Sequence, residues 1–446
     1  MTAAAEVAEV LKTPLPAAPG RVAHWRKRFS EVSGLQPRLR HPKAYVNWLR
    51  ANYELLTRSG TIGARPLKLT FDPTNYCQLR CPLCPTGARI QDRDRGRAQR
   101  HVFEHLMEEV GDYVFLLDFF NWGEPLLNEQ AEELVSIASR RNIVTFLSSN
   151  LSIPMNDQRI GRLVDSGLSQ LIVSLDGASA ATYGTYRRVG RFDLVLDNMK
   201  RVLAARRARG MTTPRVNWQF LVFRFNEHEI ETVRRMADDL GVDSVTFRAP
   251  FLDEGRVPLS AADKTAVGGW APTRLEFNRY DEASPAHTVV PARPRCGWHY
   301  MSTAINWDGT VAPCCTVFEK RDDFGQLSGA GGDYMSIVNN AKFRAVRDSF
   351  AGRGAGADGA DPQGLVCLKC PTPFLMDYHS HVNRQILLYS AASALDALRH
   401  PIRRFRTRAS KTSVLSSGQP PVDVDVDGDG AGAPAARTVF PLELRS

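Results

Sequence analysis

The stretch that decides the fold runs from Leu69 to Cys84 and reads Leu69-Thr70-Phe71-Asp72-Pro73-Thr74-Asn75-Tyr76-Cys77-Gln78-Leu79-Arg80-Cys81-Pro82-Leu83-Cys84. Its apolar start indicates a β-strand, and the loop that follows carries cysteines in the spacing Cys-x3-Cys-x2-Cys. Three thiolates can hold three irons of a cubane and leave the fourth iron without a protein ligand. An iron left open in this way can bind a substrate and act on it. The spacing alone leaves two alternatives open, a zinc site lacking one ligand and a set of buried thiols.

Short apolar runs alternate with helical stretches around and after this loop. We expect strands at Leu67–Phe71, Tyr113–Phe120, Val144–Ser148, Gln170–Ser174, Arg215–Phe223 and Ser244–Phe247. We expect helices at Phe103–Gly111, Glu129–Arg141, Ile160–Ser166, Leu194–Gly210 and Glu227–Leu240. The alternation predicts an α/β fold with a parallel sheet. This number of strands favours an open or partial barrel, with the active site at the carboxyl ends of the strands.

In this setting the cysteine loop resembles that of the radical S-adenosylmethionine (SAM) superfamily, and later strand ends resemble its other motifs. Asn121-Trp122-Gly123-Glu124-Pro125 is similar to the Gly-Gly-Glu-Pro motif of the family, with Trp122 in place of the first glycine. Ser148-Ser149-Asn150 closes the third strand, and Ser174-Leu175-Asp176-Gly177 resembles the segment that contacts ribose. Arg187 matches the arginine that pairs with the methionine carboxylate, which a guanidinium can bind bidentately. Leu83 departs from the family, because many relatives carry an aromatic residue there that packs on adenine.

The resemblance implies a partial (β/α)6 TIM-type barrel whose [4Fe–4S] cluster splits SAM reductively. The implied catalytic cluster ligands are Cys77, Cys81 and Cys84. The implied SAM contacts are Gly123, Glu124, Pro125, Ser148, Asn150, Ser174, Asp176 and Arg187. The 5′-deoxyadenosyl radical that SAM yields would take a hydrogen atom from the substrate.

A second group of cysteines lies near the C-terminal end, at Cys296, Cys314, Cys315, Cys367 and Cys370. The stretch from Ile305 to Val311 predicts a β-hairpin with Asp308-Gly309 at its turn. The region resembles the twitch domain, the shortened relative of the SPASM domain. This resemblance implies one auxiliary [4Fe–4S] cluster on Cys296, Cys314, Cys367 and Cys370. A structural zinc on the same four thiolates is the alternative, and Cys315 is a spare thiol or an alternative ligand to Cys314.

Length and composition limit the possible classes of protein. The chain has 446 residues and a formal net charge of +9, and no apolar run reaches the roughly 20 residues of a membrane span. The first ten residues are acidic and Ala-rich and lack the pattern of a secretion signal. Cysteines grouped at short spacing in a chain without such a signal are typical of metal sites in a reducing cytoplasm. We therefore expect a cytoplasmic protein without a membrane span.

The sequence divides into six expected segments. Residues 1–65 form a basic helical extension, 66–250 the radical SAM partial barrel, and 251–295 a linker or lid. Residues 296–378 form the twitch/SPASM-like domain, 379–410 a basic helix, and 411–446 a disordered tail. The basic stretches lack regularly interleaved aromatic residues, so we expect no nucleic-acid partner.

Two classes of reaction remain open. In the first, the enzyme is an oxidoreductase of dehydrogenase type that oxidises or rearranges a small polar metabolite, such as a sugar or aminocyclitol, in a biosynthetic pathway. In the second, it is a maturase that modifies a ribosomally synthesised peptide. No leader-binding unit is evident in residues 1–65, which favours the first class. The expected partners are the substrate and an electron donor such as flavodoxin or ferredoxin, and the substrate-facing candidates are Gln219, Arg224, Asn226 and Arg248.

Overall fold

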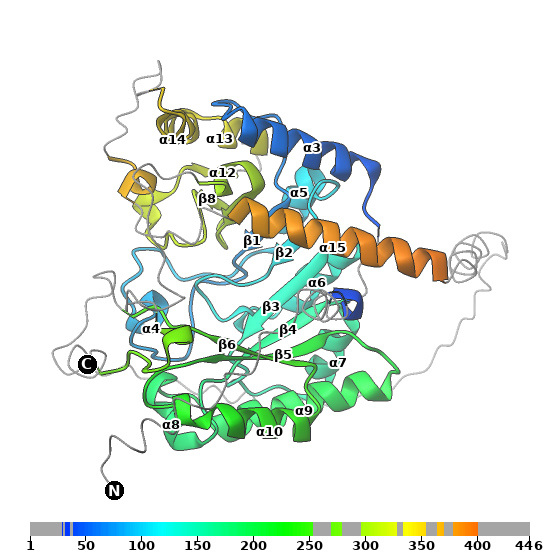
Figure 1. Ribbon diagram of the computed structural model, residues 1–446, viewed down its shortest axis with the longest axis vertical. Helices are drawn as coiled ribbons and strands as arrows, with labels where there is room; N and C mark the ends of the chain where they lie inside the picture. The colour runs from blue at the N-terminus through cyan, green and yellow to red at the C-terminus, as the bar shows by residue number, and fades with distance from the viewer. Residues whose placement is uncertain are drawn as a thin grey trace, which may run out of the picture. The chain divides into compact units, whose positions relative to one another are not determined.

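A twisted sheet of parallel strands forms the centre of the molecule (Figure 1). The computed structural model describes residues 29, 32–35, 39–252, 269–278, 296–327, 333–353, 364–369 and 378–399. The first six strands are β1 (Lys68–Phe71), β2 (Leu116–Asp118), β3 (Val144–Ser149), β4 (Gln170–Ser174), β5 (Arg215–Leu221) and β6 (Ser244–Arg248). They pair in sequence order, each parallel to the next. The predicted α/β fold with an open, partial barrel is confirmed.

Helices connect these strands, as right-handed crossovers in a parallel sheet require. They are α5 (Arg100–Val110), α6 (Ala131–Arg140), α7 (Asp157–Asp165), α8 (Ala180–Tyr186), α9 (Phe192–Ala208) and α10 (Ile230–Leu240). The rings of Phe71 on β1 and Phe103 on α5 lie 4.7 Å apart, and both rings contact Phe119. The buried apolar side chains of strands and helices thus share one core. In Figure 1, α9 and α10 lie along one side of the strands.

The second cysteine region extends the same sheet. Strand β7 (Ser302–Ile305) pairs in parallel with β1, and β8 (Thr310–Ala312) and β9 (Gly325–Gln326) continue antiparallel. The predicted hairpin is confirmed, and Gly309 in its turn has a φ of +82°, a conformation that favours glycine. The nine-stranded sheet has the order β6-β5-β4-β3-β2-β1-β7-β8-β9. Backbone hydrogen bonds between β7 and β1 therefore join the region of the second cysteine group to the first strand.

The short helix α4 (Pro85–Ala88) follows the first cysteine loop. The second cysteine region also contains α12 (Trp298–Met301), α13 (Tyr334–Val338) and α14 (Ala341–Ala351). The 3-10 segments are η1 (Pro125–Leu127), η2 (Glu227–Glu229), η3 (Leu275–Phe277), η4 (Lys320–Asp322) and η6 (Val366–Lys369).

Two helices outside the barrel pack against each other. The indole Nε1 of Trp48 on α3 (Pro42–Leu56) donates to Asn383 Oδ1 on α15 (Tyr378–Arg399) at 2.6 Å. Asn52 and Asn383 also exchange hydrogen bonds between their amides. The basic helix expected from residue 379 is present as far as Arg399, and the expected tail lies outside the described residues. None of the described helices is long and apolar enough to cross a membrane.

Candidate functional site

The loop after β1 brings three thiols together. Cys81 is buried and Cys77 and Cys84 are partly exposed, and all three pack in one cluster with Leu79 and Phe223. Burial raises the pKa of Cys81 to about 12 and also raises the pKa of Cys77, and repulsion between neighbouring thiolates adds to both shifts. Thiolates here therefore need a cationic partner. Soft sulfur ligands gathered in one loop fit an iron–sulfur cluster, which supplies that positive charge.

A short helical turn follows the three thiols. Within the ranges that the structure describes, no three His, Cys, Asp or Glu side chains converge closely enough to hold one metal ion. A cubane does not need such convergence, because each thiolate binds a different iron. The turn of α4 then closes back on the loop, and a Cβ at Gly87 would lie 2.4 Å from the Cys81 carbonyl oxygen.

Glu124 is held in a fixed position beside this loop. Its carboxylate accepts hydrogen bonds from Ser149 Oγ at 2.7 Å and from the Asn150 N–H at 2.8 Å. Its own backbone N–H donates to the Tyr76 carbonyl oxygen at 2.9 Å. Glu124 is only 2% exposed, and burial raises the pKa of this carboxyl, opposed by these hydrogen bonds. The second and third motifs therefore meet at one buried acceptor next to Cys77.

Asn150 connects the third motif to the cysteine loop. Its Nδ2 donates to Cys77 Sγ at 3.5 Å, and its Oδ1 accepts from Gln78 Nε2 at 2.9 Å. On the neighbouring strands, the hydroxyls of Ser148 and Ser174 lie 3.4 Å apart. The predicted residues at three strand ends thus lie together along the carboxyl edge of the sheet.

Arg187 and Asp176 bind each other. Arg187 Nε donates to Asp176 Oδ2 at 2.6 Å, and Asp176 Oδ1 accepts from the Leu221 N–H at 2.7 Å. Asp176 is fully buried. The guanidinium also lowers the pKa of Cys81, against the larger effect of burial, so it lies close to that thiol. Both carboxylate oxygens are engaged within the protein, and the ribose contact of Asp176 stays a prediction.

Asp72 and Trp122 make contacts around the second motif that the sequence did not indicate. Buried Asp72 accepts hydrogen bonds from the N–H groups of Trp122 at 3.1 Å and Gly123 at 3.4 Å, and burial raises its pKa to about 7. The indole Nε1 of Trp122 donates to the Val317 carbonyl oxygen at 3.0 Å, and its ring packs edge-on against Phe318 at 5.5 Å. Trp122, the departure from the family motif, therefore contacts the loop that carries Cys314 and Cys315.

The second group of thiols gathers in an apolar setting. Cys296, Cys314 and Cys315 belong to one cluster that also contains Trp298 and Tyr378. Trp298 Nε1 is buried without a hydrogen-bond partner among the described residues, and a sulfide or thiolate acceptor would satisfy it. Cys367, on η6, is buried, with its neighbour Val366 in the same cluster. These residues fit an iron–sulfur cluster, while Cys370 lies outside the described residues.

The structure keeps both neighbouring thiols as candidates. The Cys314 Sγ lies 3.0 Å from Thr316 Oγ1. Burial and the charge of Cys314 raise the pKa of Cys315, whereas Lys68 lowers it. Lys68 is paired with Asp118 at 2.8 Å. Both Cys314 and Cys315 therefore stay candidate ligands of the auxiliary cluster.

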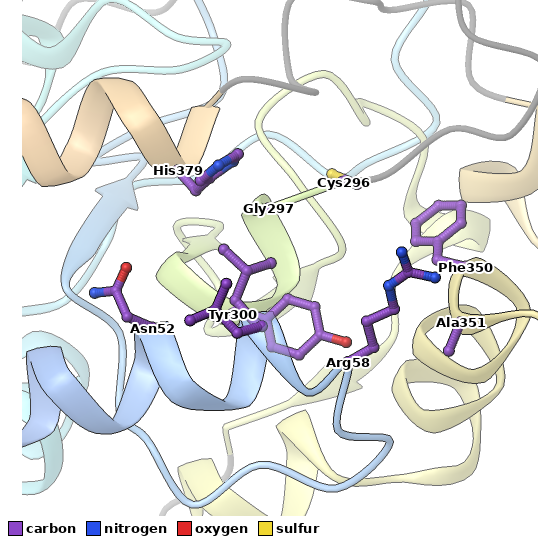
Figure 2. Close-up of a pocket in the computed structure, with 10 residues that line it drawn as sticks. Asn52, Arg58, Cys296, Gly297, Tyr300, Phe350, Ala351 and His379 are labelled. Carbon is purple, nitrogen blue, oxygen red and sulfur yellow. The ribbon is translucent and has the colours of Figure 1, made fainter.

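A pocket of about 260 Å³ borders Cys296 (Figure 2). Figure 2 shows Cys296 and His379 on one side of it, and Tyr300 and Arg58 on the other. It is lined by residues of α3, α12, α14 and α15.

The predicted linker contributes an unexpected residue, Trp270. This buried ring packs against Tyr186 at 6.1 Å and Phe223 at 5.6 Å, in the same cluster as Cys81. Arg224, a predicted substrate contact, instead donates from its side chain to the Ala271 carbonyl oxygen at 3.0 Å. Of residues 253–295, the structure describes only 269–278.

The remaining substrate-facing candidates differ in how deeply their side chains are buried. Asn226 is fully buried and binds backbone atoms of Asp176, Leu221 and Phe223, so it is a structural residue. Gln219 is half-buried on β5, and Arg248 is exposed at the end of β6.

Comparisons with known proteins match both parts of the chain. The family model described as "Radical SAM superfamily" matches residues 71–237, and the SPASM model, an iron–sulfur cluster-binding domain, matches residues 296–371. A relative from Mycobacterium ulcerans, "Mycofactocin maturase MftC", is 24% identical over 305 residues, which cover 66% of this chain and 80% of that protein. "PqqA peptide cyclase" from Gluconobacter oxydans is 26% identical over 185 residues, 42% of this chain and 49% of that protein.

Among solved structures, SuiB of Streptococcus suis bound to S-adenosylmethionine matches with a TM-score of 0.49 and 13% identity, over 70% of this chain and 73% of that one. The two family models imply [4Fe–4S] clusters and SAM as cofactors. The thiol groups and the motif contacts described above lie within the matched ranges. The chain therefore contains a radical SAM domain followed by a C-terminal SPASM iron–sulfur domain.

Proposed function

We propose that this chain is a radical SAM maturase that modifies a peptide. The observation that carries the proposal is the similarity of the chain to two relatives, of which one is named a maturase and the other a peptide cyclase. This reverses the order that the sequence alone favoured, since the sugar or aminocyclitol dehydrogenase was the first expectation. The relatives support the peptide alternative better.

The edge of the sheet also favours an extended substrate. Strand β6 pairs with β5 alone among the described residues, and its side chains are half-buried, apart from exposed Arg248. An open edge can add the backbone of an extended peptide through main-chain hydrogen bonds. The carboxyl end of β6 lies at the same end of the parallel strands as the cysteine loop.

We assign the ligands and contacts of the first cofactor site as follows. Cys77, Cys81 and Cys84 would hold a [4Fe–4S] cluster, which when bound would supply the electron for the reductive cleavage of SAM. Glu124 and Arg187 bind the amino and carboxylate groups of SAM, and Asp176 orients Arg187. The further SAM contacts that we assign are Gly123, Pro125, Ser148, Asn150 and Ser174.

The second group of cysteines would hold the auxiliary cluster, as an electron acceptor during substrate oxidation. We assign its ligands to Cys296, Cys314, Cys367 and Cys370. The first electron would come from an external reduced carrier such as flavodoxin. A reducing cytoplasm fits thiolate ligands of this kind.

The test uses anaerobically reconstituted enzyme with SAM, a reductant and short peptides encoded beside its gene. The expected result is 5′-deoxyadenosine formation stimulated by one peptide, whose mass changes in the same reaction. Sugars and aminocyclitols are the matched comparison. Stimulation by one of these, with oxidation of that compound and no peptide product, would return the assignment to the small-metabolite class.

A further inference from the structure

Three exposed arginines lie in and just after the first cysteine loop, and we call them the arginine patch: Arg80, Arg89 and Arg95. Arg80 lies between Cys77 and Cys81 in the loop itself. Arg89 caps α4, the short helix that follows the loop, with a φ of +60°. The patch therefore consists of residues whose positions are fixed by the fold of the cluster loop.

The charge of the arginine patch is not neutralised locally. Among the described residues, none of its three guanidinium groups has a carboxylate partner within ion-pair distance. Neighbouring acids are engaged elsewhere, since Asp94 pairs with Lys320 at 3.7 Å and Asp92 accepts from the Lys320 N–H at 2.6 Å.

Arg89 lies close enough to Arg80 and to Arg95 for their charges to act on it. Desolvation first, and then the charges of Arg80 and Arg95, lower the pKa of Arg89. Many other exposed arginines have an acidic partner, as in the pairs Arg97–Glu129 and Arg209–Asp165. A concentration of unpaired positive charge costs stability, so its position beside the thiols suggests a binding role.

An opening beneath the patch leads to the cluster loop. A pocket of about 40 Å³ is lined by Arg89 and Arg95 together with Tyr76, Cys77 and Thr86. Cys77 is partly exposed. A partner seated on the patch would therefore approach the cluster ligands more closely than a partner on the helical side of the sheet.

We propose that the arginine patch is the docking surface for an acidic one-electron carrier protein. This inference rests on the proposed function, because SAM cleavage at this loop needs an electron from outside the chain. One electron leaves the reduced flavin or iron–sulfur centre of the carrier and reduces the cluster held by Cys77, Cys81 and Cys84, and no bond forms or breaks between the proteins. Complementary charge steers such encounters and fixes their orientation.

Binding is measured first, on the reconstituted holoenzyme. The probe is isotope-labelled bacterial flavodoxin, an acidic carrier, followed by NMR titration at low ionic strength. The triple variant Arg80→Gln, Arg89→Gln, Arg95→Gln should raise the Kd at least about tenfold, and salt should raise the wild-type Kd in the same direction. The matched control is Arg140→Gln, Arg162→Gln, Arg207→Gln, which removes the same charge from exposed positions on α6, α7 and α9 and should leave the Kd unchanged.

The rate of 5′-deoxyadenosine formation with two different reductants distinguishes a docking defect from damage to the first cysteine site. With reduced flavodoxin the patch variant should form 5′-deoxyadenosine about tenfold more slowly, whereas with titanium(III) citrate its rate should equal that of the wild type. An unchanged Kd for flavodoxin overturns the proposal, as does an equal loss of rate with both reductants. A weakened affinity for an acidic substrate peptide with unchanged flavodoxin binding also overturns it, in favour of a substrate surface.

The single variant Arg95→Gln lies outside the cysteine loop and guards against a folding defect. It should show a smaller rise in Kd in the same direction, and the absence of any rise would contradict the proposal. Failure of the wild type to cleave SAM with titanium(III) citrate would instead contradict the proposed function. The binding titration tests the docking surface independently of that result.

Discussion

The two groups of cysteines occupy different environments. Around Cys77, Cys81 and Cys84 lie polar side chains that follow β2, β3 and helix α8, namely Glu124, Asn150 and Arg187. Around Cys296, Cys314 and Cys315 the neighbours are largely apolar, with Trp298, Ala304 and Val317 among them. The first environment can bind a zwitterion such as the methionine part of SAM. The second can enclose a cluster but offers few groups for a polar ligand, which suits redox or structural use.

The two environments are nevertheless connected. The Asp72 N–H donates to the Ile305 carbonyl oxygen at 2.9 Å, and Arg93 forms a nearly buried ion pair with Asp323 at 2.5 Å. Trp122 adds its hydrogen bond to Val317. These contacts join the two cysteine regions, so coupling between the clusters can depend on residues that touch neither cluster.

The largest expected effect comes from removing either group of cysteines, because each removal should stop a different step. Changing Cys77, Cys81 and Cys84 together to Ala should abolish 5′-deoxyadenosine formation, because no open iron remains. Changing Cys367 and Cys370 to Ala should spare uncoupled SAM cleavage and stop substrate oxidation. Chromatography of the nucleoside product measures both. Cleavage by the first variant, under the same reductant, would show that the loop after β1 is not the reactive site.

The next effect concerns the polar lining of the first site. Arg187→Ala should weaken SAM binding roughly 10- to 150-fold, since a charge-assisted hydrogen bond contributes on the order of 1.5–3 kcal/mol. Iron content should be preserved, and Arg187→Lys, which keeps a charge beside Asp176, should lose less affinity. Calorimetric titration with SAM gives the values. Unchanged affinity in Arg187→Ala would assign the carboxylate to Arg188 or Arg191.

A smaller effect is expected at the connection between the sites. Trp122→Gly restores the family residue but removes the hydrogen bond to Val317 and the contact with Phe318. A hydrogen bond contributes about 1 kcal/mol, so the ratio of 5′-deoxyadenosine to product should rise about fivefold, with SAM affinity unchanged. Trp122→Phe should give an intermediate ratio. An unaltered ratio in both variants would show that the two sites are coupled by another route.

The smallest effect tests the choice between adjacent thiols. Cys315→Ala should leave the iron content and the auxiliary cluster intact, if Cys314 is the ligand. The same measurement on Cys314→Ala should show cluster loss. The opposite pattern would identify Cys315 as the ligand.

Local and periodic features of the fold were readable from the sequence, and long-range contacts were not. β4 matches its predicted bounds, because its apolar run is sharply delimited. Helix α8 was missed, since Ala180–Tyr186 is short and has no apolar period. Trp122 was recognised as a departure from the motif, but its contact with Val317 spans 195 positions and has no local signal.

The site shows the same division. The cysteines and the motif residues were found by spacing and order, and the structure brings Glu124, Asn150 and Arg187 to the loop. Asp72 lies in the quoted stretch, yet its burial against the second motif depends on how two strand ends meet. The pairing of Asp176 with Arg187 could likewise not be inferred from two motifs that were each matched separately.

The most direct test of one open and one closed cluster is Mössbauer spectroscopy together with elemental analysis of the reconstituted wild-type protein, with and without SAM. We expect roughly eight irons in two cubanes, with SAM altering one iron of one cubane and leaving the other cubane unchanged. Zinc in the second site with only about four irons, or spectral changes in both cubanes or in neither, would contradict the division into one open and one closed cluster.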